Sequence, residues 1–127
     1  MKQLLDTHTF IWFVTGNSKI NTKIQHQIED NDNLISIGSI WEIAIKSSIG
    51  KLSLGLSIEQ LVNEQITANG IEILDITTQH LEIVERLPLH HRDPFDRLII
   101  SQAMVEKISI IGTDKIFDRY AVQRLWQ

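Results

Sequence analysis

Carboxylate side chains recur in this sequence where an apolar run has just ended or a helical pattern is just beginning. Four of them stand at such points: Asp6, Glu42, Asp96 and Asp114. Clustered carboxylates cannot all stay ionised without a compensating cation. Ligands that offer only oxygen suit Mg²⁺ or Mn²⁺. If the fold gathers these residues, the sequence predicts a divalent metal site.

Such a site has a definite chemistry. Carboxylate-held Mg²⁺ or Mn²⁺, as one ion or two, can activate a water and neutralise charge on the leaving oxygen of a phosphodiester. Hydrolysis of RNA or DNA would also need cations at the rim to contact phosphates. The basic residues near the acids are Lys46, Lys51, Arg92, Arg97 and Arg119. For each of them an ordinary solvated charge is the more common explanation.

Each acid taken singly also has a structural explanation, because acids and hydroxyls are favoured where helices begin. Asp6 could cap a helix at Phe10–Val14, and Ser39 with Glu42 matches a capping box, with Lys46 able to pair with Glu42. The same explanation covers three further positions, Asp93, Asp96 and Asp114. An interaction module without catalysis, whose acids only cap helices, therefore remains an alternative.

The elements that would position the acids alternate along the chain. The predicted strands are Gln3–Leu5, Leu34–Ile37, Ile71–Leu74, Ser109–Ile111 and, as a fifth, Val122–Trp126. The predicted helices are Asn21–Asp30, Ser39–Ser48, Ser57–Asn69, Thr77–Leu87 and Asp93–Lys107. This order predicts an α/β protein, a three-layer α/β/α sandwich with a mainly parallel central sheet. The carboxyl ends of parallel strands share one edge, where ligands bind, so the acids are expected to converge there.

Composition narrows the classes of function. The 127 residues show no linker or repeat, which predicts one domain over residues 1–127. A net charge of −4 means that any nucleic acid must be held by a local patch. Without cysteine there is no disulfide framework, zinc finger or thiol nucleophile. The N-terminal apolar stretch reads as neither signal peptide nor membrane span, so we expect a cytoplasmic protein that does not contact a membrane.

Other residues that could do chemistry lack a supporting pattern. The histidines have no spacing that suggests a metal pair on one helix face; they are His8, His26, His80, His90 and His91. Trp12, Trp41 and Trp126 could stack on bases, but aromatic residues among Ile and Leu are more often core. No serine-hydrolase elbow, dinucleotide-binding glycine pattern or phosphate-binding loop occurs.

Five segments of the sequence carry distinctive motifs: LDTHT from Leu5, SIWEIAIK from Ser39, GKL from Gly50, HRDPFDRLII from His91, and the ending from Thr113 to Trp126. Together these motifs resemble PIN-domain ribonucleases of the VapC toxin type. They occur in the right order along essentially the whole chain. The resemblance implies a PIN-like fold and a Mg²⁺- or Mn²⁺-dependent endoribonuclease, the toxin of a type II toxin–antitoxin pair, with a small antitoxin as partner.

The resemblance also implies roles for particular residues. Asp6, Glu42 and Asp96 would be metal ligands, and Asp114 would be the fourth ligand or a water-mediated contact. Asp93 could line the same face or serve only as a helix cap. The residues expected to contact substrate are Lys46, Arg97 and Thr113. One departure is Gly112, where family members often carry Ser or Thr.

Two further expectations concern function and partners. A receiver-like Mg²⁺-binding signalling domain is an alternative, although Asp6 is followed by Thr7 and Thr113-Asp114-Lys115 matches that class only in part. Apolar residues on the helices exceed what one sheet needs to cover, which predicts a homodimer and antitoxin docking. These residues are Ile24, Ile28, Ile43 and Leu61.

Overall fold

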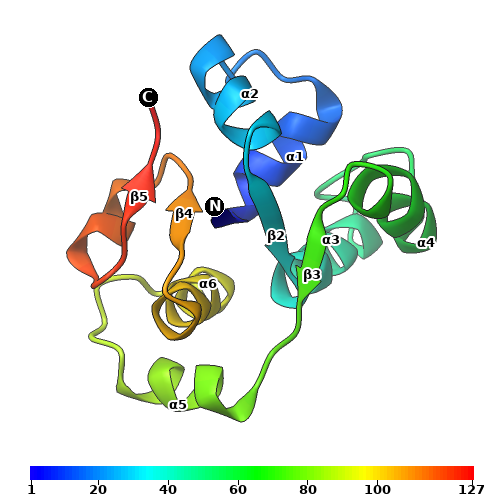
Figure 1. The fold of residues 1–127 in the computed structure, drawn as a ribbon. Helices are drawn as coiled ribbons and strands as arrows, with labels where there is room; N and C mark the ends of the chain where they lie inside the picture. Colours follow the sequence, from blue (N-terminus) through cyan, green and yellow to red (C-terminus); the bar gives the residue numbers. More distant parts are fainter.

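A five-stranded parallel sheet forms the centre of the molecule, in a computed structural model that describes residues 1–127 (Figure 1). The strand order is β3-β2-β1-β4-β5, and every neighbouring pair is parallel. The strands are β1 (Lys2–Leu5), β2 (Asp32–Ser36), β3 (Glu72–Leu74), β4 (Ser109–Ile111) and β5 (Arg124–Leu125). The first strand therefore lies in the middle of the sheet.

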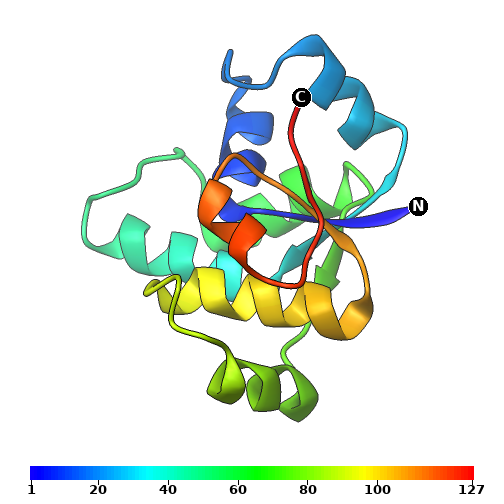
Figure 2. The ribbon, with the colours of Figure 1, turned by 90° about the vertical axis from the view of Figure 1, so that its left-hand side faces the viewer.

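Helices connect the strands and cover both faces of the sheet. The helices before β3 are α1 (Thr7–Thr15), α2 (Thr22–Glu29), α3 (Ile37–Ser48), α4 (Ile58–Gln60) and the π-helix η1 (Leu61–Thr67). The helices after β3 are α5 (Thr78–Arg86), α6 (Pro94–Glu106) and the short 3-10 helix η2 (Lys115–Arg119). Figure 2 shows α6 running beneath the sheet, with α5 below α6 and α1 and α2 on the opposite side. The predicted α/β/α architecture is confirmed.

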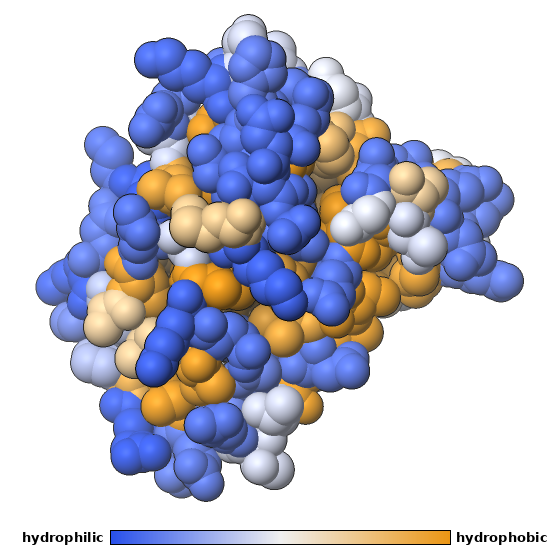
Figure 3. Space-filling model, in the orientation of Figure 1, coloured by the Kyte–Doolittle hydropathy of each residue, from blue (hydrophilic) through white to orange (hydrophobic).

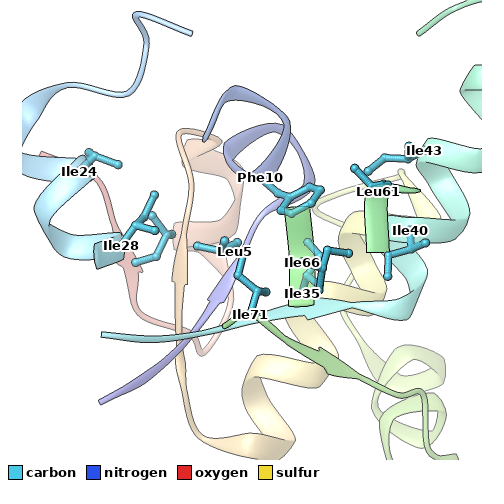
Figure 4. Close-up of a cluster of buried hydrophobic side chains, with 11 residues drawn as sticks. Leu5, Phe10, Ile24, Ile28, Ile35, Ile40, Ile43, Leu61, Ile66 and Ile71 are labelled. Carbon is cyan, nitrogen blue, oxygen red and sulfur yellow. The ribbon is translucent and has the colours of Figure 1, made fainter. Parts of the chain in front are cut away.

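Two buried clusters fill the space between the layers. Side chains alternate across a strand, so Leu4 and Leu5 face opposite sides of the sheet. Leu5 packs with Phe10 and with the helices before β3 in the cluster of Figure 4, whereas Leu4 packs with Ile99 and Phe117 on the other side. Each strand of the centre contributes to both clusters in this way. The sheet is thus held from both faces, and the carboxyl ends of its strands are fixed at one edge.

Most predicted elements are confirmed within one to three residues, but two helices differ from expectation. Helix α3 begins at Ile37 because the Ser36 hydroxyl caps it, accepting a hydrogen bond from Gly38 N at 3.0 Å. The capping box predicted for Ser39 and Glu42 is therefore wrong, since both lie inside the helix. The helix predicted over Ser57–Asn69 begins with the expected capping box but continues as the π-helix η1.

The apolar residues expected to form a docking surface are not on the surface. Ile24, Ile28, Ile43 and Leu61 belong to the buried cluster against the sheet, so that argument for a dimer is wrong. The expectation of core tryptophans is wrong for Trp41, which is 58% exposed. Figure 3 shows apolar residues reaching one face of the molecule in patches between polar ones. None of the helices combines the length and the apolar character needed to cross a membrane.

Candidate metal centre

The carboxyl-end edge of the sheet gathers the four predicted acids. Asp6 follows β1, and Asp114 follows the neighbouring β4. Glu42 lies on α3, which begins directly after β2, and Asp96 lies in the first turn of α6. The negative charges of Asp114 and Glu42 act on Asp6, and those of Asp6 and Glu42 act on Asp96. Four acids from distant parts of the chain therefore share one electrostatic environment.

Asp6 is the most buried of these acids and has an unpartnered oxygen. It is 3% exposed, and its Oδ1 accepts no hydrogen bond. Burial is the main cause that raises the pKa of Asp6 to about 7, opposed by a hydrogen bond from the Thr7 backbone and reinforced by Asp114 and Glu42. Asp6 precedes α1 but its side chain makes no capping bond. The Asp6 carboxylate therefore does not cap α1.

Asp96 lies in the same environment as Asp6. Burial raises the pKa of Asp96 above its usual range, and the neighbouring charges of Asp6 and Asp93 raise it further. A negative charge in the first turn of α6 is favoured by the helix dipole. That gain is outweighed here by burial among like charges.

Glu42 and Lys46 form an ion pair on the rim. The Lys46 Nζ lies 2.7 Å from Glu42 Oε2, and this hydrogen bond is the main cause that raises the pKa of Lys46. The predicted pairing of these two residues is confirmed. Ser39 lies one turn before Glu42 on α3. Its hydroxyl accepts a hydrogen bond from the Thr7 hydroxyl at 2.7 Å, which connects α3 to the start of α1. Glu42 is thus fixed beside Asp6.

Asp93 and Asp114 both cap helices. Asp93 Oδ1 accepts hydrogen bonds from Phe95 N and Asp96 N, at 2.8 and 3.2 Å. Asp114 Oδ1 accepts from Ile116 N at 3.0 Å, which caps η2. Both capping predictions are confirmed. Asp114 nevertheless keeps a second oxygen directed at other residues of the site.

His91 joins this site, which the sequence did not predict. Its Nε2 lies 2.8 Å from Asp114 Oδ2 and 3.1 Å from Asp96 Oδ2. One ligand atom from each of these three residues lies within 4.8 Å of the others. The spacing argument missed His91 because it applies to helices, whereas His91 lies in the irregular segment between α5 and α6. Its closeness in sequence to Asp93 and Asp96 was the signal available.

The residues expected to contact substrate are placed differently from one another. Lys46 stands on the rim, and Thr113 is exposed beside Asp114. The Arg97 guanidinium instead donates to four backbone carbonyls, at 3.1 to 3.2 Å. Those carbonyls belong to Val84, Leu87, Pro88 and His91. Arg97 is therefore committed to holding the chain before α6, and we do not assign it to substrate.

Gly112 allows β4 to pass closely behind Asp6. A Cβ atom built at Gly112 would lie 3.0 Å from the Asp6 Cβ and 3.3 Å from its Oδ2. A side chain there would have to displace the Asp6 carboxylate by a few tenths of an ångström. The departure from the family pattern at Gly112 is therefore coupled to the position of Asp6.

These residues fit a divalent cation. The unpartnered Asp6 Oδ1 is the observation that matters, because a buried carboxylate oxygen without a hydrogen bond is costly unless a cation compensates it. The other acids supply further oxygens, as Mg²⁺ and Mn²⁺ prefer. A buried, unpartnered carboxylate oxygen among other acids therefore fits such an ion.

The fold and the site define a class of protein: an α/β/α domain with a parallel sheet and acids gathered at the carboxyl ends of its strands. The PIN domain family model matches residues 4–123, and the chain belongs to the PIN domain family. This confirms the family proposed from the sequence motifs, and it replaces the receiver-like alternative. None of the curated proteins matches the chain.

Several solved structures share the fold of this chain. The chain matches a chain in the crystal structure of VapBC2 from Rickettsia felis bound to a promoter DNA fragment, with a TM-score of 0.73 and 16% identity over 98% of each chain. A toxin–antitoxin complex from Klebsiella pneumoniae gives 0.67 and 16%, over 98% of this chain and 96% of that one. FitAB bound to an IR36 DNA fragment gives 0.70 and 17%, over 97% and 93%. At these identities the likeness establishes the fold.

Proposed function

We propose that this protein, acting as one domain over residues 1–127, is a Mg²⁺- or Mn²⁺-dependent endoribonuclease. The observation that carries the proposal is the Asp6 carboxylate, buried without a partner for Oδ1 among other acids at the carboxyl-end edge of a PIN fold. Asp6, Glu42 and Asp96 are assigned as ligands of the cation. Asp114 is assigned as a fourth ligand or as a contact through water.

The proposed reaction is hydrolysis of an RNA phosphodiester bond. When bound, the cation would lower the pKa of a water and neutralise charge on the leaving oxygen. The acids would fix the position of the cation. Gly112, which has no side chain, allows Asp6 to lie close to the end of β4. Lys46, whose side chain is 41% exposed, offers the phosphate a positive charge beside Glu42.

The direct test is cleavage of a mixed cellular RNA pool, and of single-stranded DNA of similar length, by purified protein. Reactions contain Mn²⁺, Mg²⁺ or EDTA, and Asp96→Asn protein is assayed beside Asp30→Asn, which changes an exposed aspartate outside the site. We expect RNA cleavage by the wild-type and Asp30→Asn proteins with metal and none by Asp96→Asn. Cleavage that persists in EDTA would contradict the proposal, and cleavage of DNA alone would change its substrate.

The same proposal includes a biological role as the toxin of a type II toxin–antitoxin pair. Its support is the resemblance of the chain to VapC-type toxins and the fold shared with chains from VapBC2, FitAB and a further toxin–antitoxin complex. We propose a small antitoxin encoded beside this protein as its partner, and a homodimer as its own assembly state. Co-expression with this antitoxin should inhibit the RNA cleavage described above. Light scattering of the purified protein alone should give twice the mass of the monomer. A stable monomer that binds no small neighbouring gene product would contradict this role.

A further inference from the structure

The segment that carries His91 is fastened on both sides. The Tyr120 hydroxyl accepts hydrogen bonds from the backbone N–H groups of His90 and His91, at 3.0 and 2.7 Å, and donates to the Pro88 carbonyl at 2.7 Å. Arg97 donates to the His91 carbonyl at 3.1 Å and also holds Pro88. Two side chains from distant parts of the chain thus fix the backbone of a segment that has no regular secondary structure. The position of the His91 ring is therefore built into the fold.

The hydrogen bonds of the His91 ring assign its proton. Nδ1 lies 3.3 Å from the backbone nitrogen of Asp93, which can only donate, so Nδ1 is the acceptor. The proton of a neutral ring then stands on Nε2, which faces Asp114 and Asp96. A metal ligand would need the lone pair at Nε2 and a proton at Nδ1, and that proton would face the Asp93 N–H. The network thus favours a donor at Nε2.

Each oxygen of the Asp114 carboxylate has one hydrogen-bond partner in this arrangement. Its Oδ1 accepts from Ile116 N and its Oδ2 from His91, whereas Asp6 Oδ1 has no partner. The His91 N–H lies between two carboxylates that would otherwise repel each other. It can hold Asp114 and Asp96 close to Asp6 before any cation arrives.

We propose that His91 is a positioning residue of the metal site, which acts by donating its Nε2–H to Asp114 beside Asp96, 3.1 Å from the same nitrogen, and does not bind the metal itself. This inference rests on the metal-dependent function proposed above. It adds a residue outside the four acids to the machinery of the site. It also predicts that the ligands remain oxygen atoms only, which keeps the site suited to Mg²⁺ and Mn²⁺.

The test is a titration of the protein with Mn²⁺ in the absence of RNA. The electron paramagnetic resonance signal of free Mn²⁺ monitors how much of the ion is bound. The variants are His91→Ala, which removes the donor, and His91→Gln, whose amide N–H can replace it. The control is His90→Ala, an exposed histidine next in sequence. We expect His91→Ala to weaken Mn²⁺ binding by about 10- to 100-fold, as loss of such an outer partner does. The Mn²⁺ affinity of His91→Gln should stay within about threefold of the wild-type value, and that of His90→Ala should equal the wild-type value.

A second measurement separates a donor from a ligand even if a variant folds poorly. Long-range ¹H–¹⁵N spectra of the wild-type protein with and without Mg²⁺ report which ring nitrogen of His91 carries the proton. We expect Nε2 to stay protonated when Mg²⁺ is bound, and a deprotonated Nε2 would overturn the proposal in favour of ligation. Equal Mn²⁺ affinity of a folded His91→Ala protein and wild type would overturn it too. If wild type binds no Mn²⁺ at all, the proposed function fails together with this inference.

Discussion

The two ends of β1 bury polar side chains in opposite ways. At its amino end Gln3 is completely buried, and its amide is satisfied by Asn33, by the Gln27 carbonyl and by the Gln27 side chain, at 2.7 to 2.9 Å. The Asn33 amide in turn donates to the Ile28 carbonyl at 2.7 Å. At the carboxyl end Asp6 is just as deeply buried, but one oxygen has no partner and its neighbours are acids. A satisfied neutral network holds a fold together, whereas an unsatisfied charged one costs stability and indicates a site for a ligand.

The largest expected effect comes from Asp6→Asn. Neutral amides bind hard cations poorly, so Mn²⁺ affinity and RNA cleavage should fall by roughly a hundredfold or more, beyond the loss expected for an outer partner. Because Mn²⁺ binds the native state preferentially, wild type should gain melting temperature with Mn²⁺ and Asp6→Asn should lose most of that gain. Thermal melts with Mn²⁺ and with EDTA measure this. An unchanged response to Mn²⁺ would mean that Asp6 resembles Gln3 and is only structural.

The second-largest effect is expected in the pH dependence of stability, which should distinguish the two ends of β1. The pKa of Asp6 is raised from 3.8 to about 7 in the folded protein, so folding favours its protonated form. The contribution of Asp6 is fully present below its unfolded pKa and is lost as the pH rises through about 7. In EDTA the free energy of unfolding should therefore fall between about pH 4 and pH 7, by at most about 1.4 kcal/mol per pH unit for each proton that only the folded state holds.

Urea unfolding across that pH range provides the measurement, with Asp6→Asn as the matched variant. Its stability should depend less on pH than that of wild type, because the neutral amide does not titrate. Gln3 and Asn33 cannot titrate either, so their network contributes nothing to the slope. A wild-type stability that rises over this range would contradict the burial of an unpartnered acid.

Breaking the satisfied network should affect stability alone. Gln3→Leu removes the donor to Asn33 Oδ1 and leaves that buried oxygen without its partner. We expect a loss of about 1 to 3 kcal/mol in the free energy of unfolding. Urea unfolding measures the loss, and a Mn²⁺ titration of the folded variant should match wild type. A large change in Mn²⁺ affinity would show that the two ends of β1 are coupled.

The smallest effect is expected for Tyr120→Phe, which removes the hydroxyl that holds the backbone of His90 and His91. Arg97 still fastens the same segment, so we expect Mn²⁺ affinity to fall only a few-fold, less than for His91→Ala. Isothermal titration with Mn²⁺ can resolve this difference. A loss as large as that of His91→Ala would assign the positioning of the ring to Tyr120 alone.

The regular elements could be predicted because their signals are local. Continuous apolar runs mark the buried strands, and the caps at Ser57, Thr77 and Asp93 mark three helix starts. The start of α3 was placed wrongly because Ser36 and Ser39 both suit a helix start, and only the packed structure uses Ser36. The π-helix η1 has no local signature of the kind used for helices.

The site was harder to predict in its contacts than in its acids. A parallel sheet places the carboxyl ends of its strands at one edge, so the residues that follow β1 and β4 are expected to lie near each other. By contrast, the role of Arg97 depends on carbonyls up to 13 residues away, and that of His91 on a segment shaped by Tyr120. Burial of the apolar helix residues was also misjudged, because the sequence does not say how deeply the helices before β3 pack. Tertiary packing decides such contacts.

Arg97 has a consequence for the thermodynamics of ligand capture. An irregular segment normally loses conformational entropy when a ligand orders it, and that loss weakens binding. Here four carbonyl bonds from one guanidinium order the segment before α6 during folding. A lysine could not reproduce this planar fork of donors. A ligand bound at the proposed site would therefore meet a segment that Arg97 has already ordered, because the entropy of that ordering is lost when the chain folds.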